Sequence, residues 1–210
     1  MHLRHQCIHS QLGAAGPRGF RLAGDEARWS RARAFSLDDL ALELRLDHAA
    51  GAVSGEALLT LRRVDPEARW AELDAIEHTL EAVEREADEG WREASYAYDG
   101  EVLRVDLGDV PDGGVTRLRV VYRATPRRGL YFTAPDQARP DRPTQVWSQC
   151  QDQDGRHWFP CQDHPGQRMT TSLAVTVPRG WFALSNGVLQ ESVDVDGGTR
   201  FAWVQTEPHP

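Results

Sequence analysis

The stretch FSLDDLALELRLDHAAGAVSGEALLTLRRV, residues 35–64, carries the clearest structural pattern in the chain. Every second residue from Leu40 to Leu46 is a leucine, which is the two-residue period of a half-buried strand. The turn-forming letters DHAAG follow, and a second apolar run at 56–64 comes next. This stretch therefore predicts two strands joined by a turn.

Similar short runs recur along the rest of the sequence, separated by the turn signals Asp-Gly and Asp-Gly-Gly. Short apolar runs with regular turns are typical of antiparallel sheets. We therefore expect an all-β fold. The further predicted strands are 102–107, 115–124, 172–177 and 201–205.

One segment carries a conflicting pattern. The apolar residues of 72–88 recur at spacings of three and four, which favours an amphipathic helix. From the pattern alone, helix and strand remain equally good predictions for this segment.

The first 33 residues have neither a strand period nor a helix period and contain scattered glycine and proline. They predict a flexible N-terminal extension, followed by one domain over 34–210. The extension has no apolar run of the length that a secretory signal needs, and nothing later approaches about 18 apolar residues. With only three cysteines, no disulfide framework is indicated. We therefore expect a cytoplasmic protein without a membrane partner.

Charge argues against nucleic acid as a partner. The chain has 32 acidic and 24 basic residues, a formal net charge of −8, and no lysine. A phosphate backbone requires a basic patch, whereas acids and arginines are interleaved here. The sequence indicates an ordinary solvated surface.

The segment VWSQCQDQDGRHWFPCQDHPGQRMTT, residues 146–171, concentrates residues capable of chemistry. His157, Cys161 and His164 have the spacing of one helix face, but Pro160 makes a helix there very costly. The spacing also differs from that of a zinc finger. Hydrogen-bonded histidines and a packed cysteine are the better prediction, and a buried, inert Cys161 is favoured over a nucleophile.

Two glutamines in this segment suggest a binding role. Strand alternation would place Gln149 and Gln151 on one face and Cys150 on the other. A side-chain amide can accept a hydrogen bond from an ammonium group while remaining uncharged. The residues alone leave two interpretations open, an amine-binding pair and a polar strand face in water.

The order of these motifs resembles the amino-terminal domain of the M1 family of zinc aminopeptidases, which includes aminopeptidase N and the leukotriene hydrolase branch. RGLYF at 128–132 and TEPHP at 206–210 also resemble family segments. The resemblance covers roughly residues 35–210. The matching central residues are Gln149, Gln151, Arg156, Phe159, Pro160, Cys161, Asp163, Pro165 and the run Ala183-Leu184-Ser185-Asn186.

The resemblance implies a saddle-shaped domain of antiparallel sheets, with strands rather than a helix in 72–88. It also implies that Gln151, paired with Gln149, holds the free amino group of a peptide substrate. The neighbouring residues would support this loop structurally, without binding metal. These support residues are Arg156, Phe159, Pro160, Cys161, Asp163 and Pro165.

Hydrolysis in this family needs zinc, held by His-Glu-x-x-His and a further glutamate. No histidine of the chain is followed by glutamate. The resemblance therefore implies that zinc belongs to a catalytic domain after residue 210, which would act on the bound peptide. No cofactor is expected in this chain, and the fragment alone is predicted to be inactive.

Two alternatives stay open. A non-catalytic scaffold module derived from the same family would have the same sequence pattern. A carbohydrate-binding sandwich is a weaker alternative, in which Trp147, Trp158 and Trp181 would form a stacking platform.

Overall fold

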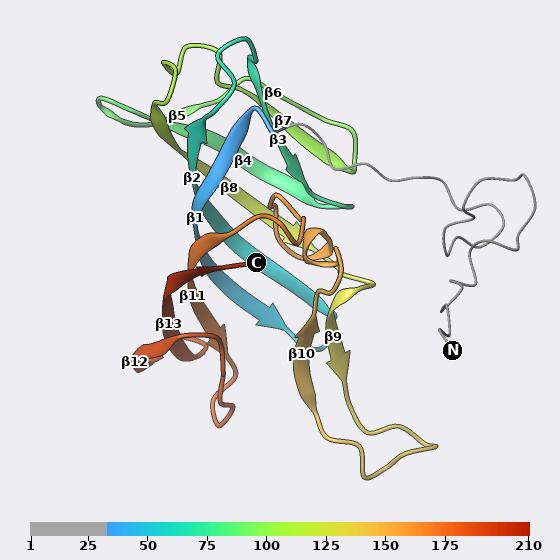
Figure 1. Cartoon of the computed structure of the whole chain (residues 1–210). Coiled ribbons are helices and arrows are strands. Elements are labelled where there is room, and N and C mark those ends of the chain that lie inside the picture. The colour runs from blue at the N-terminus through green and yellow to red at the C-terminus, as the bar shows by residue number, and fades with distance from the viewer. Residues whose placement is uncertain (1–32) are drawn as a thin grey trace, which may run out of the picture. The chain divides into compact units, whose positions relative to one another are not determined.

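The computed structural model describes residues 33–210, which form thirteen strands, one short 3-10 helix and no α-helix (Figure 1). The predicted all-β class is confirmed. The predicted extension 1–33 lies, except for its last residue, outside the described residues. Across the described part, no helix is long and apolar enough to cross a membrane.

The main sheet contains eight of the strands, in the order β12-β13-β11-β1-β2-β8-β4-β5. In Figure 1 it runs as one long twisted surface from β5 to β12. Its strands are β1 (Phe35–Asp47), β2 (Ala52–Arg63), β4 (Thr79–Ala87), β5 (Gly90–Glu93), β8 (Val115–Ala124), β11 (Met169–Val177), β12 (Val188–Val195) and β13 (Gly198–His209).

One pairing in this sheet differs from the antiparallel pattern that we expected. β1 pairs with β11 in parallel, from Asp39 opposite Thr170 to Arg45 opposite Thr176. All other pairings in the main sheet are antiparallel. The sheet is therefore mixed. The long segment 125–168 between β8 and β11 allows the chain to enter β11 in the same direction as β1.

The quoted leucine stretch forms β1 as predicted, with one irregularity. Phe35 and Leu37 are buried at odd positions, whereas Leu40 and Leu44 are buried at even positions. A register shift against β2 lies between Leu37 and Asp39. The bulge adds one residue between the two sets, so the apolar side chains before it and after it all point into the core.

Segment 72–88 is strand, so the helix suggested by its periodicity is wrong. Its ordered parts are β3 (Trp70–Asp74) and β4. Within β4 the register shifts between Leu80 and Ala82, so that Leu80 lies opposite Tyr122 and Val83 opposite Val120. The bulge places two apolar residues three positions apart on one face, and this mimics a helical spacing.

A smaller sheet of three strands, in the order β3-β7-β6, shares the core of the main sheet. It contains β3, β6 (Tyr96–Tyr98) and β7 (Val102–Asp106). Its buried Leu73, Leu103 and Val105 belong to the same hydrophobic cluster as residues of β1, β2, β4 and β8. The apolar faces of the two sheets therefore cover each other.

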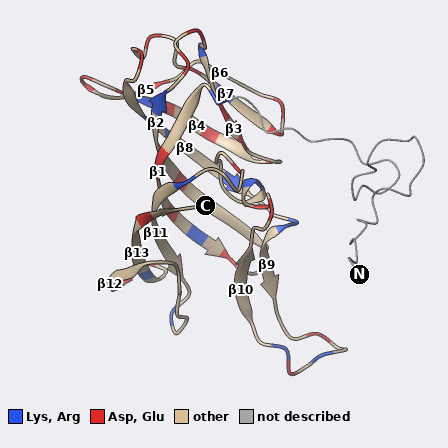
Figure 2. Cartoon of the chain, viewed as in Figure 1, with Lys and Arg blue, Asp and Glu red and all other residues tan. Residues whose placement is uncertain are grey.

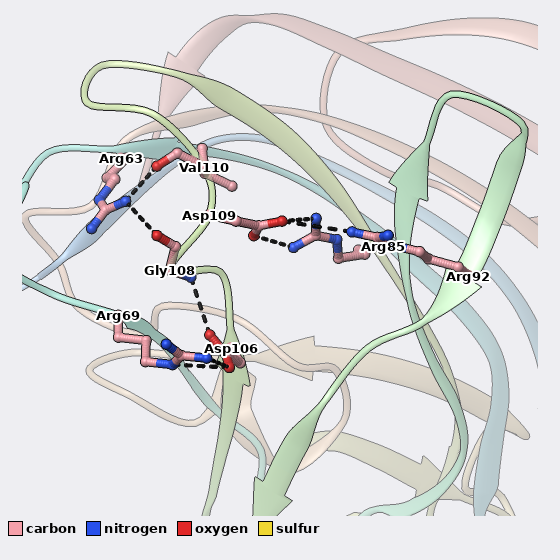
Figure 3. A network of polar contacts seen from close by, with 8 residues as sticks. All are labelled: Arg63, Arg69, Arg85, Arg92, Asp106, Gly108, Asp109 and Val110. Atoms are coloured by element: carbon pink, nitrogen blue, oxygen red, sulfur yellow. Dashed lines mark hydrogen bonds and ion pairs between the residues drawn. The ribbon is translucent and has the colours of Figure 1, made fainter.

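A buried arginine, Arg63, joins the loop after β2 to the loop after β7. The Arg63 guanidinium donates hydrogen bonds to backbone carbonyls, and Figure 3 shows it bonded to Gly108 and Val110, beside the pairing of Asp109 with Arg85 and Arg92. The carbonyls that accept from Arg63 are those of Asp65, Pro66, Ala68, Gly108 and Val110. Elsewhere, charges of both signs are interleaved along the strands (Figure 2).

The remaining two strands form a hairpin that projects from the main sheet in Figure 1. These are β9 (Gly129–Thr133) and β10 (Gln145–Gln149), which pair with each other. The 3-10 helix η2 (Gly155–His157) follows β10 after a short turn. This hairpin and turn carry the glutamines selected from the sequence.

Candidate functional site

Both candidate glutamines are exposed, at the end of β10 and in the turn after it. Gln149 is the last residue of the strand, whereas Gln151 lies in the turn. Strand alternation, which we used to place both on one face, therefore does not extend to Gln151. The turn is closed by the Asp154 amide, which donates to the Cys150 carbonyl at 2.9 Å. The peptide bond between Gln151 and Asp152 is cis.

Arg156 and Asp163 hold the segment after the turn. The Arg156 backbone amide and Nε both donate to Oδ2 of Asp163, at 3.1 and 2.9 Å, and Nη2 donates to the Asp163 carbonyl at 2.8 Å. Nη1 of Arg156 also lies 3.3 Å from Oδ1 of Asp74 in β3. Burial acts to lower the pKa of Arg156, but the hydrogen bond to Asp163 and the charges of Asp74 and Asp163 outweigh it and raise that pKa. The segment thus closes around one guanidinium with two carboxylate partners.

Backbone hydrogen bonds fix the same segment to β3. The Asp74 amide donates to the Cys161 carbonyl at 2.7 Å, and the Cys161 amide donates to the Asp74 carbonyl at 3.1 Å. The Ile76 amide donates to the Arg156 carbonyl at 2.8 Å. The loop that follows the glutamines is therefore joined to the last residue of β3 and to the segment directly after it.

The other predicted support residues differ in burial. Cys161 is 2% exposed, and burial raises the pKa of its thiol well above the ordinary value. Pro160 is also buried, Phe159 is half-buried, and Pro165 lies exposed in a turn. Cys150 has a pKa that is raised by burial, and its sulfur accepts from Trp158 Nε1 at 3.4 Å. Neither thiol has the lowered pKa of a nucleophile.

Three polar residues that sequence reasoning missed complete this support. The Gln162 amide accepts from the Leu37 backbone at 3.2 Å and donates to the Phe35 carbonyl at 2.6 Å. The Gln167 amide donates to the Leu37 carbonyl at 2.5 Å. Asp74 is the third, through its contacts with Arg156. No local sequence signal marks these residues, since each partner lies far away in the chain.

The candidate zinc ligands are not assembled into a metal site. Among residues 33–210, no group of three or more His, Cys, Asp or Glu side chains could hold a metal ion. His157 Nε2 lies 3.8 Å from Asp154 Oδ1, and the ring of His164 accepts from the Gly166 amide at 3.0 Å. The histidines therefore make local contacts instead.

A cleft of about 990 Å³ lies beside the glutamine turn. Its lining includes Gln149 and Trp147 of the hairpin but does not include Gln151. His209 and Pro210, the last residues of the chain, line the same cleft. The exposed apolar side chains of Phe182 (62%) and Leu184 (77%) lie in its wall. Its apolar lining also includes Leu40, Leu42, Leu44, Leu46, Val175 and Val177.

The three tryptophans of the carbohydrate alternative do not present one common platform. Trp158 packs edge-on against Phe159, and Trp181 packs edge-on against His48. Both also pack against the hydrophobic core. Trp147 is the exposed member of the three, and it stacks on Tyr131.

Comparison with known proteins agrees with this architecture. Human aminopeptidase B is 30% identical over 210 residues, covering 90% of this chain and 32% of that protein. The chain thus spans about a third of the length of this curated relative.

Solved structures of lower identity share the fold. An M1 zinc metallopeptidase from Deinococcus radiodurans superposes with a TM-score of 0.69 at 21% identity, covering 84% of this chain and 40% of that one. Yeast LTA4 hydrolase in complex with bestatin gives a TM-score of 0.67 at 19% identity, covering 92% and 30%. Residues 38–210 match the family described as the peptidase M1 N-terminal domain. The chain therefore belongs to the peptidase M1 N-terminal domain family.

Proposed function

We propose that this domain anchors the free amino terminus of a peptide for hydrolysis by a zinc aminopeptidase centre in a following domain. The observation that carries the proposal is that Gln149 lines the same cleft as His209 and Pro210. A domain that continued from residue 210 would begin beside the glutamine turn. A peptide in the cleft could then contact both domains.

The chemistry of the glutamines fits an ammonium ligand. An amide oxygen accepts hydrogen bonds from an ammonium group, and such a bond contributes about 1.5–3 kcal/mol. Gln149 and Gln151 are exposed at the end of a strand and in the adjacent turn, so both amides are accessible. The contacts of Arg156 with Asp74 and Asp163 would hold that turn in place, which reduces the entropy lost on binding.

The zinc itself does not fit the residues described here. Residues 33–210 offer no set of three ligands, so a metal would have to be held by the following domain. Zinc in such a domain would activate water. This chain would contribute binding and orientation of the substrate amine. A related M1 metallopeptidase from Deinococcus radiodurans has been crystallised with a Tyr-Ser-Ala substrate, which supports a peptide ligand.

The amine contact can be tested on the 210-residue chain by NMR titration. We expect Leu-Ala amide to cause saturable shifts at residues 145–154, and N-acetyl-Leu-Ala amide to bind about tenfold more weakly, because acetylation removes the ammonium donor. Gln149→Leu and Gln151→Leu should each weaken binding of the free-amine peptide. Gln190→Leu, on the exposed edge strand β12, is the matched control. Equal binding of the two peptides would contradict the proposal.

The gene sequence after codon 210 separates this function from a scaffold module. An in-frame His-Glu-x-x-His motif would support the aminopeptidase. In a longer protein of that kind, Gln151→Ala should raise KM or lower kcat without altering the fold. A stop codon directly after residue 210 would favour the non-catalytic module.

A further inference from the structure

Trp147 has an environment that the proposed amine contact does not explain. It lies in β10 and remains 45% exposed although it lines the cleft. Its ring stacks on Tyr131 of β9, with the centroids 4.5 Å apart and the planes at 23°. The two residues are directly opposite in the strand register. The stack therefore fixes the orientation of the indole before any ligand binds.

One face of this indole has no neighbouring strand. Within the described residues the hairpin sheet has two strands, in the order β10-β9, so β10 is an edge strand. Tyr131 covers the indole from the side of β9. Trp147 is 45% exposed, so part of the indole remains open to solvent. An exposed aromatic ring can accept another ring in a stacked or edge-on geometry.

The position of Trp147 relative to Gln149 suggests which part of a ligand would reach it. The two residues are two positions apart in β10, so their side chains project from the same face, about 6.7 Å apart along the strand. Both line the cleft. Gly129 is the residue opposite Gln149, and the Asp154 carbonyl and the Trp158 ring lie where its side chain would be. A ligand whose amine contacts Gln149 would therefore have Trp147 as a neighbour on the same face of β10.

We infer that Trp147, held by Tyr131, forms a subsite for the aromatic side chain of the amino-terminal residue of the peptide. The inference rests on the proposed function, because the amine contact at the glutamines sets the register of the ligand. The subsite would select a ring for its π-face, in addition to its apolar area. An aliphatic ring of the same carbon number is therefore the discriminating comparison.

The test compares two peptides that differ only in aromaticity. The 210-residue chain is titrated by NMR with Phe-Ala amide and with cyclohexylalanyl-Ala amide. We expect the phenylalanine peptide to bind about threefold to tenfold more tightly, the range expected for an aromatic pair beyond its buried area. Trp147→Leu should remove this difference, whereas Trp147→Phe should keep most of it. Trp70→Leu, at a half-exposed tryptophan of β3 outside the cleft lining, is the control and should keep all of it.

The outcomes separate the subsite from the amine contact. Equal affinities for the two peptides, or a difference that persists in Trp147→Leu, would overturn the subsite. If N-acetylation still weakened binding in that case, the proposed function would stand. If N-acetylation had no effect while the aromatic preference depended on Trp147, the amine contact would fail, and the assignment of the subsite to the amino-terminal residue would be overturned with it. Absence of saturable binding by every peptide would overturn both.

Discussion

Arg156 is the residue whose loss should most directly release the glutamine turn. It pairs with Asp163 and with Asp74, which lie 89 positions apart, and all three side chains are mostly buried. Arg156→Leu would leave two shielded carboxylates without their cation, so we expect unfolding free energy to fall by about 2–3 kcal/mol in urea denaturation. Arg179→Leu removes an exposed ion pair with Asp194 and should change it by less than about 0.5 kcal/mol. Similar losses in both variants would contradict a special role for Arg156.

His78 should make stability depend on pH between about 4 and 6.5. The ring is 5% exposed and stacks on Tyr122, and burial lowers the pKa of His78 from 6.5 to about 4. The fold therefore accepts the neutral ring, whereas the unfolded chain takes up a proton near pH 6.5. The contribution of the neutral His78 ring to the free energy of unfolding is complete above about pH 6.5. It falls by roughly 3 kcal/mol in total as the pH drops toward 4.

His78→Phe keeps an aromatic stack but cannot titrate, so its unfolding free energy should vary much less over this interval. The measurement is urea denaturation of both proteins at several pH values. Carboxylates with a lowered pKa, such as Asp109 beside Arg85, reduce stability mainly below about pH 4 and do not obscure the comparison. Parallel pH profiles for the two proteins would refute the assignment.

The sequence identified some of these residues because they belong to a motif, and missed others because their partners are distant. Arg156 and Asp163 stand in one short segment, so the family resemblance selected both. Asp74 lies in a separate strand, and only the fold brings it to Arg156. Strand alternation could not predict the position of Gln151 either, because β10 ends two residues before it.

At the scale of elements, periodicity was reliable where strands are regular. The alternating leucines of β1 predicted a strand correctly. In β4, the bulge at Leu80 and Ala82 added one residue between two core positions, and the pattern resembled a helix. The parallel pairing of β1 with β11 left no local signal, because it depends on how the intervening segment returns. Periodicity reports which residues are buried, but not which strands are neighbours.

Gly129 should be essential for packing the turn at 150–154 against the hairpin. Its φ is +77°, and a Cβ atom there would lie 2.0 Å from the Asp154 carbonyl oxygen. Gly129→Ala therefore combines an unfavourable backbone conformation with a clash against backbone, and we expect a loss of about 3 kcal/mol or more. Gly180→Ala has a similar φ of +84° but open space, so about 1 kcal/mol is expected. The measurement is thermal denaturation of both variants. Equal decreases in Tm for Gly129→Ala and Gly180→Ala would show that the contact with Asp154 does not matter.

The whole molecule presents an apolar cleft to solvent, and this should promote self-association. Phe182 and Leu184 are the most exposed apolar residues of its wall. We expect sedimentation velocity to show dimers or larger species of the 210-residue chain at high concentration, because exposed apolar patches tend to be covered. The double variant Phe182→Ser with Leu184→Ser should shift the distribution toward monomer, whereas Val115→Ser, outside the cleft, should not. A parent protein that is monomeric throughout would contradict this expectation.

The purified 210-residue chain should neither bind stoichiometric zinc nor hydrolyse an aminoacyl substrate. Its sequence lacks His-Glu-x-x-His, and residues 33–210 provide no group of three ligands. Metal analysis and a fluorogenic aminoacyl assay measure both properties. One zinc per chain, or turnover that a chelator abolishes, would overturn the assignment of catalysis to another domain.

The pairing of β1 with β11 affects the order in which the sheet can form during synthesis. Strands β1, β2, β4, β5 and β8 all precede residue 125, so this part can assemble early on the ribosome. One edge of β1 then remains unpaired until β11, which ends at Val177, has been synthesised. Such distant pairings form slowly, and open strand edges invite pairing between chains. Nascent chains halted before residue 169 should therefore require chaperone protection, and those halted after the release of β13 should not.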